Sequence, residues 1–411
     1  MRWRNALLSL FALAALTAGT TRAGTAADFY VSPGGNDAWS GRRDRPDAAR
    51  GDGPVATLGR AQQLVRRLRA DEPHRQRPVV VAVRGGTYRL DQPIVFEPAD
   101  SGTPAAPTLY QAYGDERPVL SGGVRITGWK VIDGRWQAVL DDVRNGKWSF
   151  AQLFVDDQRR PRPRLPKRGY YLIGKQVPPT PEAGGRGANR FGYRGNQISA
   201  DWANLADVEV LAFHQWAASR MRIAKVDPAD RVVTFTGHTA SMESWGLFPK
   251  GNRFLVENVK EALTEPGEWY LDRPAGTLTY IPRAGEDPGR AVVVAPRLEH
   301  ILILRGDVAD GRRVHDVQFR GLAFAHANWV LPANGQSFPQ AELGLPAAVA
   351  AVGARNVLFD GCAVRQVGGY ALAFGPGCRD NRVEGCELVD LGGGGVKIGD
   401  AGPGPWGEAA K

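Results

Sequence analysis

Residues 356–375 and 380–399 carry the same pattern twice, twenty-four positions apart. NVLFDGCAVRQVGGYALAFG aligns with DNRVEGCELVDLGGGGVKIG, so that glycines, cysteines and apolar residues coincide. A third copy, residues 317–327, comes before them, with Gly321 in the place of Gly361, and an insertion separates it from the second. A repeat of this length cannot bury its apolar face alone and must stack on its neighbours. The repeat predicts an all-β chain folded as a right-handed parallel β-helix.

The first 23 residues have the features of a secretory signal peptide. Arg2 and Arg4 precede the apolar run ALLSLFALAALTA, and small residues surround Ala23. That run is too short to span a bilayer, and no later stretch is long enough. We therefore expect a periplasmic or extracellular protein without a membrane span.

The chain is basic, with a formal net charge of +9, which falls to about +6 once the leader is removed. Six of the ten residues at 159–168 are cationic. Two interpretations of this patch remain open. It could attract a polyanion such as a uronate-bearing glycan, or its arginines could pair with nearby carboxylates at the surface. Export disfavours nucleic acid as a partner.

The three cysteines do not suggest a metal site. Cys362 and Cys386 occupy equivalent repeat positions and should lie about 4.8 Å apart, one strand spacing. The earlier copy has Leu322 at this position, so a small buried apolar residue explains both, and we expect free thiols. No metal-ligand spacing is present, and we expect no cofactor.

The remaining sequence suggests three regions after the leader. Residues 24–135 contain an amphipathic helix at 56–70, expected to cap the first coil, followed by short strands at coil-like intervals. Residues 136–290 have longer strand-like stretches and form an inserted β-rich subdomain. Residues 291–411 return to the coil pattern, which we expect to be truncated at the carboxyl end.

Segments spread over nearly the whole of the chain after residue 23 resemble the pectin-lyase-like β-helix superfamily and, within it, glycoside hydrolase family 141. The resemblance is carried by FYVSPGGNDAWSG, GPVATLGRAQQLVR, RGGTYRL, GDERPVLSGGVRITGW, FAQLFVDDQRRPRPRLP, VAPRLEHILIL and LVDLGGGGVKIGD. It implies a secreted enzyme that hydrolyses plant or microbial glycans. Fucosidase and xylanase activities both occur among the relatives, and the resemblance does not choose between them.

One polar column follows from the repeat. His326, Gln366 and Asp390 each stand five residues after the corresponding glycine, so they should lie one above another on the outside of the coils. Solvated turn residues could produce this by chance, but a sugar-binding groove needs such groups. Asp390 is the leading catalytic carboxylate, because the LGGGG that follows would let a sugar approach the backbone.

Other candidates complete the expected site. Trp329 could stack on a sugar, and His214 and Trp216 could form an opposite wall if the subdomain folds back. Asp400 is the second candidate carboxylate, although it lies across a strand from Asp390. A column partner one coil onward would fall at position 414, beyond the last residue of the sequence.

Three functions are compatible with these features. The first is a glycoside hydrolase that uses paired carboxylates. The second is a polysaccharide lyase of the same fold, for which Lys397 and the arginine patch would supply the base and the positive charge. The third is a non-catalytic glycan-binding solenoid. In each case the partner is a polysaccharide or oligosaccharide, and we expect a monomer.

Overall fold

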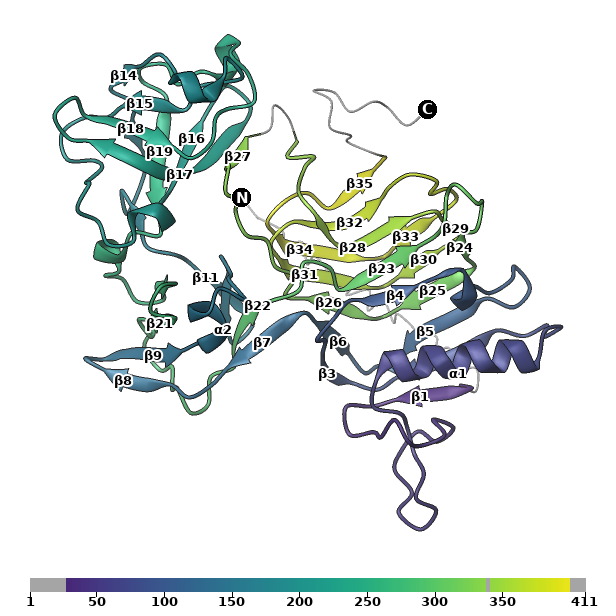
Figure 1. Ribbon diagram of the computed structural model, residues 1–411. Helices are drawn as coiled ribbons and strands as arrows, with labels where there is room; N and C mark the ends of the chain where they lie inside the picture. Colours follow the sequence, from purple (N-terminus) through teal and green to yellow (C-terminus); the bar gives the residue numbers. More distant parts are fainter. Residues whose placement is uncertain (1–26, 338–340, 400–411) are drawn as a thin grey trace, which may run out of the picture.

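The computed structural model describes residues 27–337 and 341–399. The expected signal peptide, residues 1–23, and Asp400 lie outside these residues. The fold is mostly β. One side of the molecule holds three large parallel sheets and a two-stranded parallel sheet of β24 (Val314–His315) and β29 (Ala354–Arg355), and the other side holds several antiparallel sheets (Figure 1). In the described ranges, no helix is long and apolar enough to cross a membrane.

The three large parallel sheets are here called the stack. Successive passes of the chain build them by adding one strand to each sheet in turn. The first sheet contains β1 (Phe29–Val31), β2 (Val79–Val83), β5 (Thr108–Ala112), β25 (Val317–Arg320), β30 (Leu358–Asp360) and β33 (Arg382–Glu384). The second contains β3 (Gly86–Arg89), β6 (Pro118–Ser121), β26 (Ala323–Ala325), β31 (Ala363–Val367) and β34 (Glu387–Leu391). The third contains β4 (Ile94–Phe96), β23 (Leu302–Arg305), β28 (Ala347–Val352), β32 (Tyr370–Phe374) and β35 (Val396–Ile398).

The residues aligned in the two sequence copies are register partners in the stack. Phe359 pairs with Val383 and Val364 with Leu388 in neighbouring parallel strands. Alternate residues of each strand point to the interior, where aromatic rings stack along the axis. The Phe319 and Phe359 ring centroids lie 5.0 Å apart at an interplanar angle of 20°.

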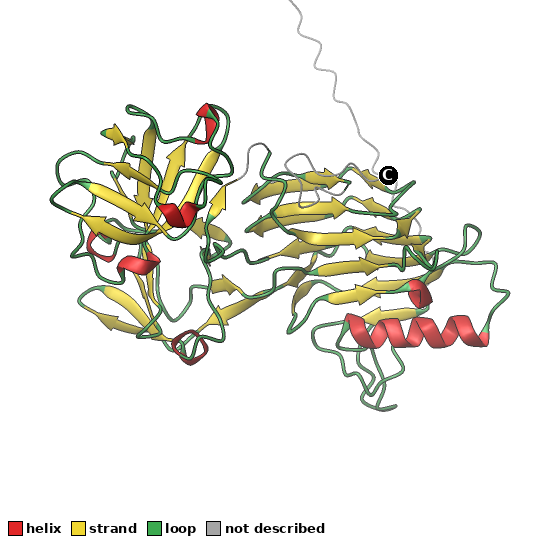
Figure 2. Ribbon diagram, turned by 45° about the horizontal axis from the view of Figure 1, so that its top comes forward, coloured by secondary structure: helices red, strands yellow, loops and turns green. Residues whose placement is uncertain are grey.

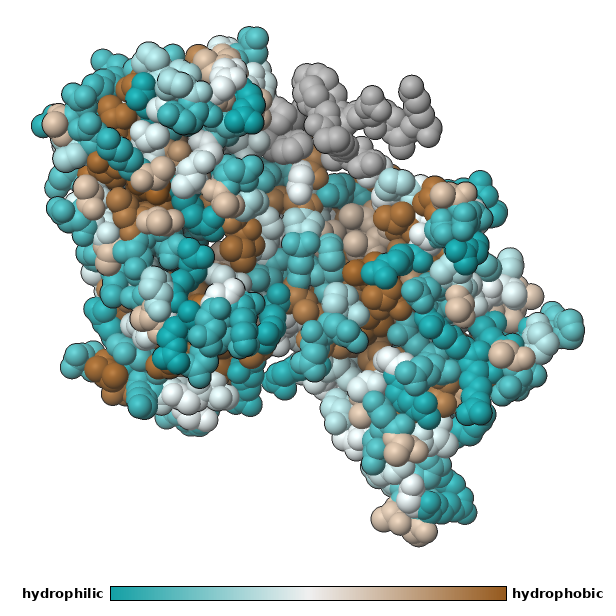
Figure 3. Space-filling model, in the orientation of Figure 1, coloured by the Kyte–Doolittle hydropathy of each residue, from teal (hydrophilic) through white to brown (hydrophobic). Residues whose placement is uncertain are grey.

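Helix α1 (Leu58–Asp71) lies across the end of the stack that begins with β1 (Figure 2). The hydroxyl of Thr57 caps it by accepting a hydrogen bond from the Arg60 amide at 3.0 Å. Two arginines of this helix bend back onto the stack, because buried acceptors lie within their reach. Arg66 binds Asp100, and Arg69 donates to Thr108. The remaining outer surface over α1 is hydrophilic (Figure 3).

The chain leaves the stack after β6 and returns at β23. The sheet next to the stack contains β7 (Gly123–Ile126), β22 (Val293–Pro296), β10 (Leu153–Val155) and β11 (Gln158–Arg160). The next contains β8 (Lys130–Ile132), β9 (Arg135–Val139), β20 (Trp269–Asp272) and β21 (Thr277–Tyr280), with the short helix α2 (Asp141–Arg144) after β9.

The far sheet contains nine strands. They are β12 (Arg164–Leu165), β13 (Tyr171–Leu172), β14 (Lys175–Gln176), β15 (Arg190–Gly192), β16 (Glu209–Phe213), β17 (Ala218–Asp227), β18 (Val232–Phe235), β19 (Arg253–Glu257) and β27 (Gln336–Ser337). We call this sheet and its loops the lobe. Because β27 comes from the insertion between β26 and β28, the lobe is tied to the stack at two places in the sequence.

The cysteines are free thiols in the part of the chain that the structure describes. Cys362 and Cys386 lie in neighbouring coils, and their sulfur atoms point to the carbonyl oxygens of Phe319 and Phe359, each at 3.4 Å. They fill apolar positions of the stack interior.

Candidate functional site

A groove with a volume of about 530 Å³ lies between the stack and the lobe. Such a volume is typical of sites that enclose a small ligand or a short oligomer. Its lining comes from both bodies and from the insertion between β26 and β28, and comprises Ala151, Gln152, Arg159, Arg160, Pro161, Arg162, Arg164, Leu211, Ala218, Arg220, Glu257, Trp329, Gln336, Glu342, Leu345, Gly368 and Gly392.

The floor of the groove includes two glycines of successive coils. A Cβ at Gly392 would lie 2.2 Å from the Gly368 carbonyl oxygen, and one at Gly394 would lie 2.4 Å from the Tyr370 ring. Close packing between coils therefore excludes a side chain at Gly392 and at Gly394. Of the glycine run after Asp390, Gly392 lines the groove.

His326, Gln366 and Asp390 occupy equivalent positions in three coils. The residues immediately before them, Ala325, Arg365 and Val389, are register partners in neighbouring parallel strands. All three have left-handed backbone conformations, with φ of 62°, 60° and 52°. Histidine and aspartate are among the non-glycine residues enriched in this conformation.

The expectation that this column faces solvent is wrong for two of its members. His326 is 5% exposed and Gln366 is 4% exposed. The cause is the β10–β11 hairpin, which lies along the column and meets each member in turn. Phe154 packs on the His326 ring with centroids 5.1 Å apart, the Asp157 carbonyl accepts from Gln366, and Arg159 binds Asp390 at 2.6 Å.

His326 is a buried neutral imidazole that hydrogen-bonds the Ser121 hydroxyl through Nδ1 at 2.9 Å. Burial lowers its pKa to about 4. The unfolded chain takes up this proton near pH 6.5, whereas the folded protein does so only near pH 4, so the free energy of unfolding should fall as the pH drops below 6.5. Between about pH 7.5 and pH 5 the loss should be about 2 kcal/mol.

The variant His326→Asn tests this prediction, because asparagine tolerates the left-handed conformation and does not titrate. Urea unfolding at both pH values should show a drop in wild type that is about 2 kcal/mol larger than the drop in the variant. Equal drops would show that another group causes the acid sensitivity.

Glu342 is the groove carboxyl whose environment favours the protonated form. It lies in the loop after β27, half-buried, and accepts a hydrogen bond from Gln336 Nε2 at 3.2 Å. Burial raises its pKa above the ordinary value of 4.5, although Gln336 and Arg220 oppose the shift. A neutral carboxylic acid in a groove can donate a proton.

The loop that carries Glu342 is fixed to the last coils of the stack. The Lys397 ammonium donates to the carbonyl oxygens of Leu343 and Leu345 at 2.9 and 2.7 Å, and the Tyr370 hydroxyl donates to the Ala341 carbonyl. Lys397, the expected base and substrate contact of the lyase alternative, therefore binds the backbone of the loop that carries Glu342.

Four charged side chains form a cluster at the lobe wall, here called the charge cluster: Arg162, Glu209, Arg220 and Glu257. Each arginine pairs with both glutamates, and the four ion pairs include Arg162 to Glu209 at 2.6 Å and Arg220 to Glu257 at 2.6 Å. Burial alone would raise the pKa of Glu209, but the two arginines hold it well below its ordinary value. The cluster joins the segment after β11 to strands β16, β17 and β19.

The structure resolves the two interpretations of the cationic patch largely in favour of pairing. Arg159 binds Asp390, Arg160 binds Glu286, Arg162 binds Glu209, and Lys167 binds Glu268. Arg164 is different, because within residues 27–337 and 341–399 its hydrogen-bond partners are the carbonyl oxygens of Pro166 and Gly169.

The remaining candidates divide between the groove and the lobe. Trp329 lines the groove, and its carbonyl accepts from Gln152 at 3.0 Å. His214 does not line it. Its ring is fixed by Ser219 at 2.7 Å and by the Leu247 carbonyl, and burial lowers its pKa. Trp216 is 59% exposed on a lobe loop beside Trp245. The lobe does supply the opposite wall of the groove, through Leu211, Ala218, Arg220 and Glu257.

Sequence reasoning missed Glu342, although a signal was present. Between residues 328 and 346, the insertion that interrupts the repeat, Glu342 is the only acidic residue. The sequence also does not indicate that Arg159 binds Asp390, because the two residues are 231 positions apart and meet only when the hairpin folds onto the stack.

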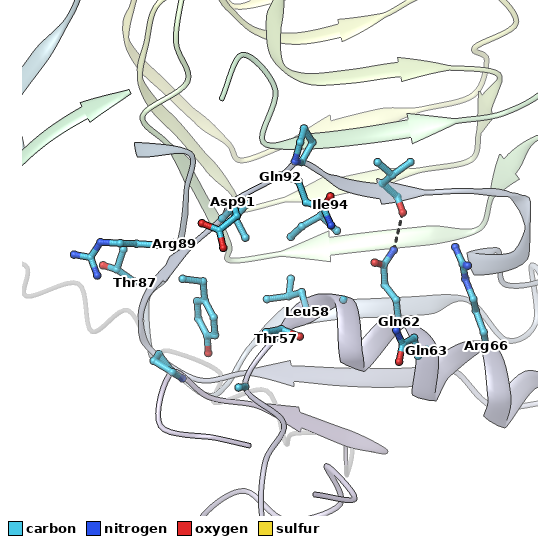
Figure 4. Close-up of a pocket in the computed structure, with 17 residues that line it drawn as sticks. Thr57, Leu58, Gln62, Gln63, Arg66, Thr87, Arg89, Asp91, Gln92 and Ile94 are labelled. Atoms are coloured by element: carbon cyan, nitrogen blue, oxygen red, sulfur yellow. Dashed lines mark hydrogen bonds between the residues drawn. The ribbon is translucent and has the colours of Figure 1, made fainter. Parts of the chain in front are cut away.

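A second hollow, of about 730 Å³, lies between α1 and the connection from β3 to β4 (Figure 4). Gln62 donates to the Val95 carbonyl at 3.0 Å across it. Asp91 is its single lining carboxylate, whereas glycoside cleavage needs two. No cluster of three or more potential metal-binding side chains occurs in residues 27–337 and 341–399.

No family model matches the chain, and no curated protein matches it in sequence. A solved structure described as a glycoside hydrolase is similar, with a TM-score of 0.76 and 24% identity, over 91% of this chain and 68% of that one. Another, described as the complex structure of XylC with xylose, has a TM-score of 0.38 and 12% identity, over 85% of this chain and 42% of that one, and supports no inference. The first likeness shows that the chain has the fold of that glycoside hydrolase structure.

Proposed function

We propose that the protein is a secreted glycoside hydrolase that cleaves a plant or microbial glycan in the groove between the stack and the lobe. In this proposal the stack is a right-handed parallel β-helix of the pectin-lyase-like kind, related to glycoside hydrolase family 141. The fold likeness to a structure described as a glycoside hydrolase supports the enzyme class. The charged and apolar pattern of residues 1–23 supports export.

The observation that carries the proposal is the half-buried carboxyl of Glu342 in a groove whose other lining carboxylate, Glu257, is bound by two arginines. Glycosidases separate two carboxyl groups by environment, keeping one protonated as the acid and the other ionised. The raised pKa of Glu342 suits the acid that protonates the leaving oxygen. Glu342 thus takes the role expected of Asp400.

Asp390 is the proposed ionised carboxylate. Its Oδ1 accepts from Arg159 Nε at 2.6 Å, and its side chain is 37% exposed. Arg159 itself lines the groove, and Gly392, two residues onward, forms part of the floor. Glu257 suits this role less well, because one of its oxygens is shared between two arginines of the charge cluster.

The test is product formation from neutral and uronate-containing polysaccharides, followed as new reducing ends and as ultraviolet absorbance of unsaturated products. We expect reducing ends without absorbance. Absorbance would support the lyase alternative, and binding without any product would support the non-catalytic solenoid.

Asp390→Asn should lower kcat by at least about 10²-fold, because it removes the ionised group while preserving shape. Asp380→Asn is the matched control. Asp380 is also an aspartate in a left-handed turn, with φ of 59°, and it pairs with Arg355 away from the groove. Equal activity in the two variants would remove Asp390 from the mechanism.

A further inference from the structure

The lobe wall of the groove continues beyond the groove on the same sheet face. Leu211 of β16 and Glu257 of β19 line the groove. Alternate residues of a strand share a face, so Phe213 lies beside Leu211, and Arg253 lies four residues along β19 from Glu257. Phe213 is also the register partner of Ala218, another lining residue.

An aromatic and cationic cluster occupies this continuation. The guanidinium of Arg253 lies 5.1 Å from the Tyr170 ring centroid and 5.7 Å from that of Phe213. Arg164, a lining residue, lies 5.9 Å from the same tyrosine ring. The two rings pack edge to face with centroids 5.1 Å apart. Tyr170 is 46% exposed.

The two arginines of this cluster lack the acidic partners that their neighbours have. Arg159, Arg160 and Arg162 all form ion pairs. Within the described ranges, neither Arg164 nor Arg253 has a carboxylate within ion-pair distance. Stacking on an aromatic ring uses the face of a guanidinium and leaves its in-plane N–H groups free. Arg253 is exposed and lies against both rings, whereas Arg164 uses Nε and one terminal nitrogen on the carbonyl oxygens of Pro166 and Gly169.

We propose that Arg164, Tyr170 and Arg253 form a subsite for a carboxylate-bearing sugar, a uronate, at the lobe end of the groove. An exposed tyrosine ring offers a surface for a sugar face, and guanidinium groups match carboxylates in geometry and charge. This inference rests on the proposed function and assigns its substrate class: a glycan that carries a uronate next to the cleaved linkage or a few units away.

The experiment measures binding, so that it does not depend on hydrolysis. Calorimetric titration of full-length Glu342→Gln protein would use an oligogalacturonate and the fully methyl-esterified oligomer of the same length. We expect the free acid to bind at least about tenfold more tightly at low salt, because a charge-assisted pair is lost on esterification. High salt should reduce the difference.

Two variants locate the effect. Arg164→Gln with Arg253→Gln should abolish the preference for the free acid, whereas Tyr170→Ala should weaken both oligomers. Arg125→Gln, which alters an exposed arginine on β7 outside the lobe face, is the control and should bind like the parent. Equal affinity for the two oligomers, no binding of either, or an unchanged preference in the double variant would overturn the subsite. Preference without hydrolysis in the wild type would retain the subsite and refute the enzyme.

Discussion

Replacing Glu342 by glutamine should lower kcat/KM by about 10²–10⁴-fold, the usual contribution of a general acid. Glutamine keeps the size of the side chain and can still meet Gln336, so the fold should be unchanged. The expected loss arises because the leaving oxygen no longer receives a proton in the transition state. The measurement is steady-state hydrolysis of the best substrate from the polysaccharide panel.

The pH profile separates an acid from a structural carboxyl. Because burial raises the pKa of Glu342 above 4.5, activity should require its protonated form and fall as the pH rises through that raised pKa. The basic limb of the kcat/KM profile should therefore disappear in the variant. Glu387→Gln, an exposed glutamate on β34, is the control and should keep both limbs. Loss of activity with an unchanged profile would argue against an acid role.

Replacing Glu209 by glutamine should cost about 3–5 kcal/mol of unfolding free energy, the largest stability effect expected in this protein. The side chain of Glu209 is 5% exposed and binds Arg162 at 2.6 Å and Arg220 at 2.8 Å. Removing its charge leaves two largely buried guanidinium groups with Glu257 as their remaining carboxylate. Burial of an uncompensated charge is the source of the loss.

Chemical unfolding of the variant tests this, with Glu384→Gln as the matched control. Glu384 pairs with Arg382 at 3.4 Å, but its side chain is 51% exposed. Solvent screens such a pair, and its loss should change stability by less than about 1 kcal/mol. Similar losses of unfolding free energy in both variants would show that burial does not increase the stabilisation that the charge cluster provides. The Glu209 variant should also lose activity through displacement of the groove wall.

The repeat determined which parts of the fold could be predicted. A period of twenty-four residues places Phe359 beside Val383 independently of the rest of the chain, because repeats of equal length pair in register as parallel strands. The mostly β architecture follows from the same argument. The β10–β11 hairpin could not be predicted, because its contacts with the column join residues about 200 positions apart.

The candidate site, like the fold, could be predicted from the sequence only in part. The repeat correctly aligned His326, Gln366 and Asp390, but alignment does not determine exposure, and the hairpin buried the first two. Trp329 was placed in the groove because it follows a coil directly. Glu342 was missed because its raised pKa depends on tertiary burial, which no local pattern in the insertion reveals.

We propose that the groove between the stack and the lobe holds the glycan, and a crystal structure of the Glu342→Gln protein with an oligosaccharide bound tests this most directly. We expect the sugar between Trp329 and the lobe wall, with a glycosidic oxygen facing residue 342. A sugar in the hollow beside α1, or on the outer face of the stack, would contradict the account.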